Sequence, residues 1–297
     1  MNFSRLLLMH ALSPLHAGTG QGVGVIDLPI AREKATGLPY VPGSSVKGVL
    51  REACMADDKG RHHVSQVFGP ESEQASDHAG TLHISDQRLL LLPVRSFAGT
   101  FAWTTSPYGL ARFARDLTAV GGALPGFIPS LPANSDQAWT TEATKLCAQE
   151  KTVILEDLDL VAQPQAAVNA WADWLGRALF PESADWQAWL RERLCVVGDD
   201  VFNFLAETAT ETTARIRLDD ETKTVAEGAL WYEEALPAES VLYGLAVAVP
   251  VKKAELEADF IFTLLARLLE KPLQFGGKAS VGRGLCQVRV ADGGATL

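Results

Sequence analysis

Residues 13–51 read SPLHAGTGQGVGVIDLPIAREKATGLPYVPGSSVKGVLR, and the fold and the site are both expected to be organised around them. Four glycines fall within residues 18–24, and a single acid, Asp27, follows in the apolar context VIDLPI. Alternating glycines weaken a strand interior, but they allow a backbone to approach another chain closely. We therefore expect the functional site in this segment.

A helix is predicted to follow the proline-bounded turn TGLPYVPG, with Ser44 or Ser45 as its cap. Lys47 and Arg51 lie four residues apart on one face of this helix. A cation in the first turn opposes the helix dipole by a few tenths of a kcal/mol, whereas an anion held by the free N–H groups would reverse that effect. A lysine at this position is more often a solvated surface residue, but the preceding glycines, together with the family resemblance given below, favour an anion site.

The two ends of the chain carry matching patterns. The apolar strand FSRLLLMHAL precedes the glycine-rich segment, while SVLYGLAVAVP, ELEADFIFTLLARLLE, LQFGGKASVGRG and LCQVRV predict strand, helix, glycine loop and strand at the far end. This order is typical of an α+β fold with a ferredoxin-like (RRM-like) β-α-β-β-α-β palm.

The remaining segments are interpreted as outgrowths of one domain over residues 1–297. Residues 57–80 are predicted as a polar loop, residues 119–200 as a mixed helical insertion and residues 205–236 as a β-hairpin. The hairpin is expected because TATETTARIRL alternates, DDETKT has turn chemistry and GALWYEE returns.

Composition restricts the class of protein. The net charge is −10, with 26 basic and 36 acidic residues, which argues mildly against nucleic acid. Net charge describes the whole surface, however, so a single groove can still be basic. The four cysteines form no C-x-x-C pair, which indicates a reducing compartment, no structural zinc and a cytoplasmic location. No apolar run approaches the ~18 residues of a membrane span, so no membrane partner is expected.

Common catalytic and nucleotide-binding fingerprints are absent. No G-x-G-x-x-G is present, GGKAS fails the P-loop pattern twice, and there is no G-x-S-x-G elbow. Two glycine-rich loops with embedded cations, GTGQGVG…VPGSSVKG and FGGKASVGRG, remain. Their backbone N–H groups are suited to holding phosphates.

Asp27 has two interpretations. It could cap the turn at Leu28-Pro29, or it could hold Mg²⁺ or another divalent cation such as Mn²⁺ and help to deprotonate a ribose 2′-hydroxyl. His16, Tyr232 and Glu233 are candidate catalytic assistants, although each could be an ordinary surface or core residue.

A different class, a hydrolase of small molecules, would use two acids in TVILEDLDLVA. Asp157 and Asp159 are predicted on one face of this strand, where paired carboxylates could do acid–base work. Carboxylates on an alternating strand more often face water, so the hydrolase class is ranked below the two classes described next.

HAGTGQGVGVIDLPIAREKATGLPYVPGSSVKGVLR, RLLLLPVRSFAGTFAWTTSP, EGALWYEEALP and LQFGGKASVGRG resemble the RAMP superfamily. More narrowly, the chain resembles the repeated backbone subunit of type III-B (Cmr) CRISPR effector complexes. The resemblance implies a palm with a hairpin thumb, copies of the chain polymerised along a guide CRISPR RNA, and other subunits of the complex as partners. It further implies an endoribonuclease that cuts the paired target RNA at regular intervals with a divalent metal and leaves a 2′,3′-cyclic phosphate.

The resemblance assigns the cutting role, and with it the metal, to Asp27. A non-catalytic RNA-binding scaffold with the same fold is the alternative. The predicted RNA-binding residues are Gly18, Gly20, Arg32, Lys34, Ser44, Ser45, Lys47, Arg51, Arg215, Arg217, Gly276, Gly277, Lys278, Ser280 and Arg283.

Overall fold

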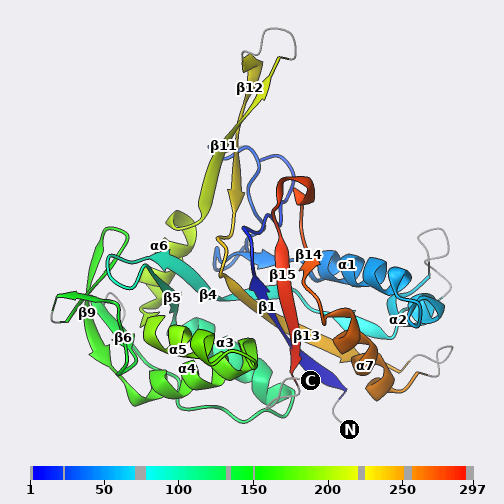
Figure 1. The fold of residues 1–297 in the computed structure, drawn as a ribbon, viewed down its shortest axis with the longest axis horizontal. Helices are drawn as coiled ribbons and strands as arrows, with labels where there is room; N and C mark the ends of the chain where they lie inside the picture. The colour runs from blue at the N-terminus through cyan, green and yellow to red at the C-terminus, as the bar shows by residue number, and fades with distance from the viewer. Residues whose placement is uncertain are drawn as a thin grey trace.

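The fold is of the α+β class, with one large mixed sheet, helices packed on it and a separate two-stranded hairpin (Figure 1). The computed structural model describes residues 3–22, 24–70, 78–131, 135–149, 151–219, 225–250 and 256–291. Within these ranges the large sheet has 13 strands. The α+β class predicted from the sequence is confirmed.

The N-terminal strand β1 is an interior strand of the sheet. Antiparallel β13 and β15 flank it, and antiparallel β4 pairs with the far side of β13. Leu7 and Met9 of β1 enter one apolar cluster, whereas Leu6 and Leu8 enter another. A continuous apolar run fits this position, because both faces of the strand are buried. These strands are β1 (Ser4–Ala11), β4 (Gln87–Arg95), β13 (Val241–Ala248) and β15 (Leu285–Ala291).

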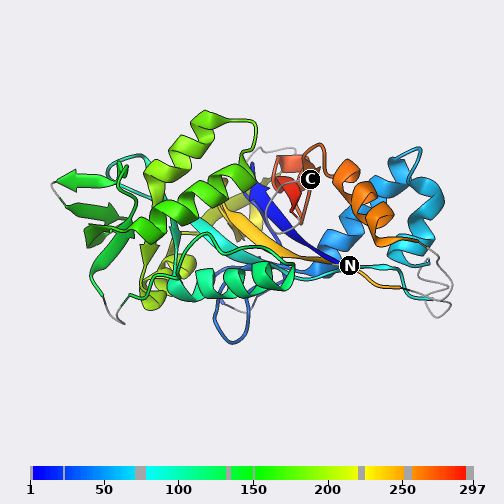
Figure 2. The same ribbon diagram turned by 90° about the horizontal axis from the view of Figure 1, so that it is seen from below.

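Helices cover both faces of the sheet. Figure 2 shows α1 and α7 together on one side of β1, with α4 and α5 on the other. The helix α3 begins at Pro107, where the Ser106 side chain caps it by accepting a hydrogen bond from the Gly109 N–H. The main helices are α1 (Gly43–Ala56), α3 (Pro107–Ala119), α4 (Ala166–Leu179), α5 (Ala184–Arg193) and α7 (Ala258–Leu268).

Part of the predicted insertion at residues 119–200 extends the sheet rather than leaving it. Beyond β4 the strand order continues β5, β10, β6, β9, β8 and β7. The single strand predicted around Asp157 and Asp159 is wrong. Asp157 lies in the turn between β8 and β9, where Glu156 has a positive φ, so the two acids share no strand face. These strands are β5 (Phe101–Thr105), β6 (Gln137–Thr140), β7 (Cys147–Gln149), β8 (Thr152–Leu155), β9 (Leu158–Pro164) and β10 (Leu194–Val197).

Residues 57–80 are not all loop. A 3₁₀ turn and a short helix occupy residues 61–68, because Val64, Val67 and Phe68 bury their side chains in the core; residues 71–77 of this prediction lie outside the described ranges. The short elements are β2 (Tyr40–Val41), η1 (Arg61–His63), α2 (Val64–Phe68), β3 (Leu82–Ile84), β14 (Leu273–Gln274) and η3 (Ala279–Val281).

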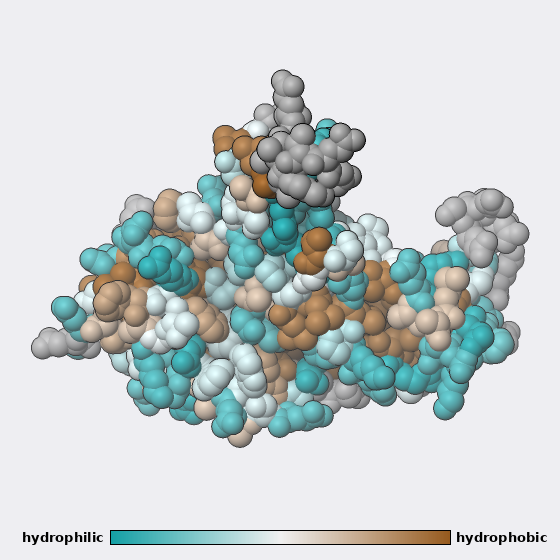
Figure 3. All heavy atoms as spheres, turned by 45° about the horizontal axis from the view of Figure 1, so that its top comes forward, coloured by the Kyte–Doolittle hydropathy of each residue, from teal (hydrophilic) through white to brown (hydrophobic). Residues whose placement is uncertain are grey.

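The predicted hairpin is present and projects away from the sheet (Figure 1). It consists of β11 (Glu211–Leu218) and β12 (Val225–Ala235), which pair in antiparallel register with Thr213 opposite Glu233. The hairpin begins later than predicted, because α6 (Asp199–Thr208) extends past residue 205. Seen from the hairpin side, hydrophilic and hydrophobic side chains are mixed around its base (Figure 3).

Among the described residues, no helix is both long and apolar enough to cross a membrane.

Candidate nucleic-acid interface

The segment that carries Asp27 runs along the base of the hairpin. Leu28 forms a parallel bridge with Glu233, the Leu28 N–H donates to the Tyr232 carbonyl at 3.0 Å, and the Glu234 N–H donates to the Leu28 carbonyl at 3.0 Å. Asp27 Oδ2 accepts a hydrogen bond from the Tyr232 N–H at 2.7 Å. The carboxylate is therefore held by the hairpin backbone, which favours a positioned side chain over a cap of its own turn.

Asp27 is exposed and lines an open hollow of about 470 Å³. Trp231 and Leu230 of β12 form part of the wall, and Lys278 of the C-terminal glycine loop brings a cation to it. The full lining is Gln21, Gly22, Asp27, Leu28, Leu230, Trp231 and Lys278. The hollow thus joins the acid of the first glycine segment to the cation of the second, although 251 positions separate them in the chain (278 − 27).

Glu233 connects the hairpin to the C-terminal glycine loop. Its Oε1 accepts hydrogen bonds from Lys278 Nζ at 2.7 Å and Trp231 Nε1 at 2.8 Å, and Arg215 Nε lies 3.4 Å from Oε2. Burial alone would raise the pKa of Glu233, but these hydrogen bonds and the two cations outweigh it and lower the pKa to about 2. A buried, strongly acidic carboxylate is a poor proton acceptor, so this geometry favours a structural role over the predicted catalytic assistance.

The Glu233→Gln substitution tests this charge pairing through the pH dependence of stability. A carboxyl group whose pKa is lowered on folding stabilises the protein above its ordinary pKa, and the contribution disappears as the pH falls to the folded value. At pH 6 the free energy of unfolding of the wild type should exceed that of the variant by on the order of 3 kcal/mol. This difference should shrink as the pH falls from about 4.5 to 2. Urea unfolding of both proteins at several pH values measures it, and a pH-independent difference would contradict the ion pairing.

His16 is buried beneath the hollow rather than open to it. It is 7% exposed, and its Nδ1 donates to the Glu234 carbonyl at 2.6 Å. A Cβ on Gly18 would lie 2.5 Å from His16 Nε2, and a Cβ on Gly276 would lie 2.4 Å from the His16 carbonyl oxygen. These two glycines are needed for close packing around His16, whereas the space around Gly20 is open.

The C-terminal glycine loop packs onto the first glycine segment. The Gly277 N–H donates to the His16 carbonyl at 2.9 Å, and Lys278 has the left-handed φ of 68°. Ser280 is exposed, whereas Arg283 is 7% exposed and donates from Nη2 to Thr213 Oγ1 at 3.1 Å. Lys278 and Ser280 therefore remain accessible for RNA, whereas Arg283 mainly fastens the loop to the hairpin.

The other predicted cations divide into two groups. Arg32 donates to the Gly37 carbonyl, the Ala206 carbonyl and Glu234 Oε1, which favours a structural role over an RNA contact. Arg215 is partly used by Glu233. Lys34 and Arg217 are exposed and accessible to a ligand.

The start of α1 differs from the prediction. Its N-cap is Pro42, so neither Ser44 nor Ser45 caps the helix, and the Gly43 N–H donates to Asp86 Oδ1 at 2.8 Å. The protein's own carboxylate thus supplies an anion at this helix end. Ser44 and Ser45 are both exposed.

Lys47 lies on the first turn of α1 and is half-buried. Burial, followed by the charge of Arg51, lowers the pKa of Lys47. The Arg51 guanidinium donates to the Gly69 carbonyl at 2.5 Å, so part of its donor capacity is already used.

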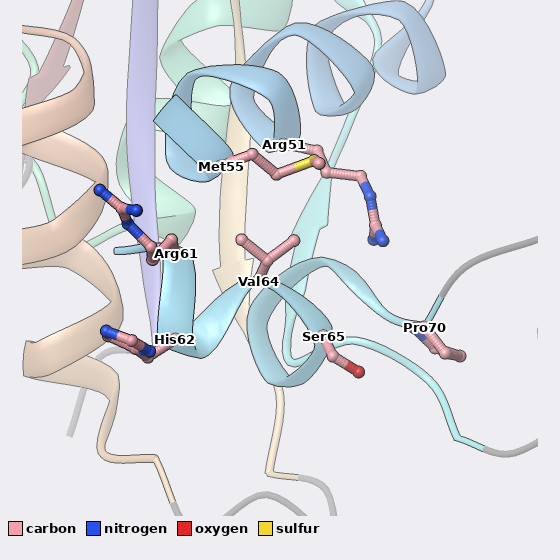
Figure 4. A pocket seen from close by; sticks show the side chains of 7 residues that line it. All are labelled: Arg51, Met55, Arg61, His62, Val64, Ser65 and Pro70. Atoms are coloured by element: carbon pink, nitrogen blue, oxygen red, sulfur yellow. The ribbon is translucent and has the colours of Figure 1, made fainter. Parts of the chain in front are cut away.

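A second hollow, of about 420 Å³, lies between α1 and α2 and is lined by Arg51, Met55, Arg61, His62, Val64, Ser65 and Pro70. Figure 4 shows Arg61 and His62 pointing to one side and Arg51 to the other. Arg61 also pairs with Asp58. Its cations do not converge, so this hollow is a weaker anion site than the one beside Asp27.

Metal ligands are sparse. Across the described ranges no three His, Cys, Asp or Glu side chains come together as a potential metal site. Asp27 is the one acid among the described residues that line the hollow, and any cation at this position would need further ligands from water or from a bound phosphate.

Glu234 and Trp231 are the residues at this site that the sequence reasoning did not single out. Glu234 is 2% exposed and contacts the Asp27 segment, and Trp231 lines the hollow. The signal was the run WYEE, because two consecutive acids in a strand place one carboxylate on each face.

The structure has a mixed sheet with a projecting hairpin, and two glycine-rich loops meet at the base of that hairpin. The hollow there is open and is lined by one acid and one cation, Asp27 and Lys278, which does not describe an enclosed small-molecule pocket. The family model of the RAMP superfamily matches residues 8–287 and thus covers the sheet, the hairpin and both glycine-rich loops. The chain belongs to the RAMP superfamily.

Two curated relatives cover almost the whole chain. The CRISPR system Cmr endoribonuclease Cmr4 of Pyrococcus furiosus is 35% identical over 290 residues, which is 97% of this chain and 95% of the relative. The CRISPR system CMR subunit Cmr4 of Saccharolobus solfataricus is 25% identical over 305 residues, covering 97% and 96%.

Solved structures show the same fold. The crystal structure of oligomeric Cmr4 from Pyrococcus furiosus superimposes with a TM-score of 0.72 at 28% identity, and 97% of each chain is covered. A chain of the type III-B Cmr-beta complex bound to cognate target RNA gives a TM-score of 0.74 at 18% identity, again over 97% of each chain. At that identity the second comparison supports the fold alone.

Proposed function

We propose that this chain is the backbone subunit of an RNA-guided CRISPR effector complex of type III-B, where it binds guide RNA and cuts the paired target RNA. The observation that carries the proposal is the exposed Asp27 carboxylate, held by the Tyr232 N–H in a hollow that also contains Lys278. The 35% identical relative is an endoribonuclease of such a system. Copies of the chain, the guide CRISPR RNA, the target RNA and other subunits are the partners.

The strand order supports a ferredoxin-like palm as the finer description of the fold. The central strands run β15-β1-β13-β4, all antiparallel, with α1 between β1 and β4 in the chain and α7 between β13 and β15. This is the order expected of a β-α-β-β-α-β unit. We propose a single RAMP domain in which β11–β12 is the thumb and residues 119–200 are an insertion that extends the palm sheet.

The proposed reaction is an in-line transfer within the target RNA. The 2′-hydroxyl oxygen attacks the adjacent phosphorus, the bond from phosphorus to the 5′-oxygen breaks, and a 2′,3′-cyclic phosphate and a 5′-hydroxyl result. Asp27 accepts the proton of the 2′-hydroxyl, and water returns a proton to the departing 5′-oxygen. Lys278, held by Glu233, offsets the negative charge that develops on the phosphate oxygens.

Asp27 is also the residue that would hold the divalent cation, Mg²⁺ or Mn²⁺, that the resemblance implies. Mg²⁺ is often bound by one or two carboxylates together with substrate phosphates and water, so a lone exposed carboxylate fits this mode. When bound, the cation would neutralise phosphate charge. The Tyr232 N–H fixes Oδ2 of Asp27 and leaves Oδ1 outside that hydrogen bond.

Guide RNA binding is proposed for the accessible cations and polar groups of the two glycine-rich regions. Ser44 and Ser45 are exposed at the start of α1, with the half-buried Lys47 beside them, and Ser280 is exposed in the C-terminal loop. Contacts from these side chains to the RNA backbone hold the RNA without reading its sequence. Sequence recognition is supplied by the pairing of guide and target.

The test is a reconstituted complex containing this chain, a guide RNA and a complementary radiolabelled target. Cleavage at regular intervals, with products that end in a 2′,3′-cyclic phosphate, is expected. A mismatched target serves as the control for guide dependence. Tight target binding without any cleavage would instead establish the alternative, a non-catalytic scaffold.

A further inference from the structure

Two consecutive carboxylates are buried at the base of the hairpin, one on each face of β12. Glu233 is 3% exposed and faces Lys278, Trp231 and Arg215, as described above. Glu234 is 2% exposed and makes an independent set of contacts. Burying a carboxylate is costly unless it is hydrogen-bonded and paired. Glu233 Oε2 accepts no hydrogen bond from the described residues and has only the ion pair with Arg215, whereas both oxygens of Glu234 accept hydrogen bonds.

Glu234 is satisfied chiefly by the segment that follows Asp27. Its Oε2 accepts a hydrogen bond from the Ile30 N–H at 3.0 Å, and its Oε1 accepts one from Arg32 Nη2 at 2.5 Å. Thr210, immediately before β11, donates its hydroxyl to Oε1 at 3.0 Å. One side chain of β12 therefore joins the Asp27 segment to the residue that precedes β11.

The main chain of Glu234 adds two further connections. Its N–H donates to the Leu28 carbonyl, and its carbonyl accepts the Nδ1 proton of His16 at 2.6 Å. Contacts to residues 28, 30 and 32 repeat at every second position, as expected of an extended segment lying against a strand. Among the described residues, one β-bridge, Leu28 to Glu233, pairs this segment with β12, while residues 17–19 pair with its other side. The contacts of the Glu234 side chain to Ile30 and Arg32 therefore extend the pairing with β12 beyond Leu28 and fix its register there.

Arg32 makes this constraint rigid. The same guanidinium that pairs with Glu234 also donates to the Gly37 carbonyl at 2.9 Å and the Ala206 carbonyl at 3.0 Å. The pair is thus tied to the turn after the Asp27 segment and to α6. The Glu234 carboxylate has both oxygens hydrogen-bonded in this network, which favours a single geometry.

We infer that Glu234 is the positioning residue for Asp27: with Arg32 it locks the register of residues 28–32 along β12 and thereby places the Asp27 carboxylate at the hollow. The inference rests on the proposed function for its catalytic half. Glu234 acts through the segment and touches no RNA itself, because its side chain is buried and its two oxygens are occupied by Ile30, Arg32 and Thr210.

The first measurement is hydrogen–deuterium exchange of the full chain, which does not depend on catalysis. The Ile30 N–H is bonded directly to Glu234 Oε2, so it reports the contact. Glu234→Ala should speed exchange in peptides covering residues 26–32 by about tenfold or more, with β13 unchanged. Glu234→Gln keeps an acceptor oxygen and should restore most of the protection. Glu211→Ala, which removes a more exposed carboxylate near Arg283, is the matched control and should leave these peptides unchanged.

The second measurement is target cleavage by complexes assembled with the same variants. A displacement of a catalytic group by about 1 Å can cost up to 10²-fold. Glu234→Ala should therefore slow the single-turnover cleavage rate by about 10- to 100-fold, with the affinity for target RNA unchanged. The double variant Arg32→Ala/Glu234→Ala should be no slower than the slower single variant, because the two residues act as one unit.

The outcomes separate the alternatives. Unchanged exchange at residues 26–32 in Glu234→Ala would overturn the positioning role, and so would faster exchange with an unchanged cleavage rate or a loss confined to target affinity. If Glu234→Ala also speeds exchange in β13, the Glu234→Gln variant provides the test. Recovery of both the exchange protection at residues 26–32 and the cleavage rate supports the positioning role. Recovery of the protection alone refutes it. A wild-type complex that binds target but never cuts would refute the proposed function, and the catalytic half of this inference with it.

Discussion

Replacing Asp27 with asparagine is expected to slow target-RNA cleavage by about 10²- to 10⁴-fold, the usual contribution of a general base, while guide and target binding persist. Asparagine keeps an oxygen that can accept the Tyr232 N–H, so the hydrogen bond that positions the side chain survives. The amide cannot take a proton from a 2′-hydroxyl. The loss should therefore appear in the single-turnover rate of a reconstituted complex and not in target affinity.

The matched control for this substitution is Asp159→Asn. Asp159 is exposed on β9, in the part of the sheet that extends away from the hairpin, so the same change of charge and shape is made away from the hollow. Cleavage by this variant should match the wild type. An Asp27→Asn complex that cuts at the wild-type rate would remove Asp27 from the mechanism and leave the scaffold alternative for this residue.

The framework of the fold could be predicted because its determinants are local. The buried strand β1 follows from an apolar run, and α3 follows from Ser106 before Pro107 with Leu110, Phe113 and Leu117 on one buried face. Each signal lies within one element. The same holds for the two strands of the hairpin, each of which alternates along its own segment. Residues 220–224 of the predicted turn lie outside the described ranges.

One error arose where a distant partner replaces a local one, and another where a single residue adopts an unusual backbone conformation. Asp86, 43 positions away, accepts the Gly43 N–H at the start of α1, so the nearby serines are not needed as caps. The turn before β9 falls inside a segment whose sequence is typical of one continuous strand. Glu156 adopts a positive φ there, and the segment contains no glycine that would indicate such a turn. Sequence spacing alone carries no information on either point.

The candidate site shows the same division. Asp27 and the two glycine loops are visible as motifs, but the hollow that brings Asp27 and Lys278 together is seen only in the structure. The arrangement that places Asp27 depends on Glu234, 204 positions from Ile30. An acid on a strand looks like a solvent-facing residue until the segment that buries it is known, so its role could be inferred only from the structure.

Gly276→Ala is expected to lower the free energy of unfolding by about 3 kcal/mol, because the new Cβ would lie 2.4 Å from the carbonyl oxygen of His16. That oxygen belongs to the backbone and accepts the Gly277 N–H, so it cannot rotate away as a flexible side chain could. Relief of the clash requires the C-terminal glycine loop to separate from the first glycine segment. Lys278 and Asp27 would then no longer share one hollow.

Gly282→Ala separates this clash from backbone strain. Gly276 and Gly282 have similar positive φ values, 73° and 80°, but a Cβ at Gly282 meets no atom within 4 Å. The control Gly282→Ala should therefore lower the free energy of unfolding only by the strain of a left-handed alanine, about 1 kcal/mol. Denaturant unfolding of both variants gives the difference between their free energies of unfolding. Equal losses of unfolding free energy in the two variants would mean that Gly276 is required only for its left-handed backbone conformation and not for the close contact with His16. A larger loss in Gly276→Ala, together with weaker guide binding, would show that close contact between the two glycine regions holds the RNA-binding surface together, because the single added methyl group acts only across that contact.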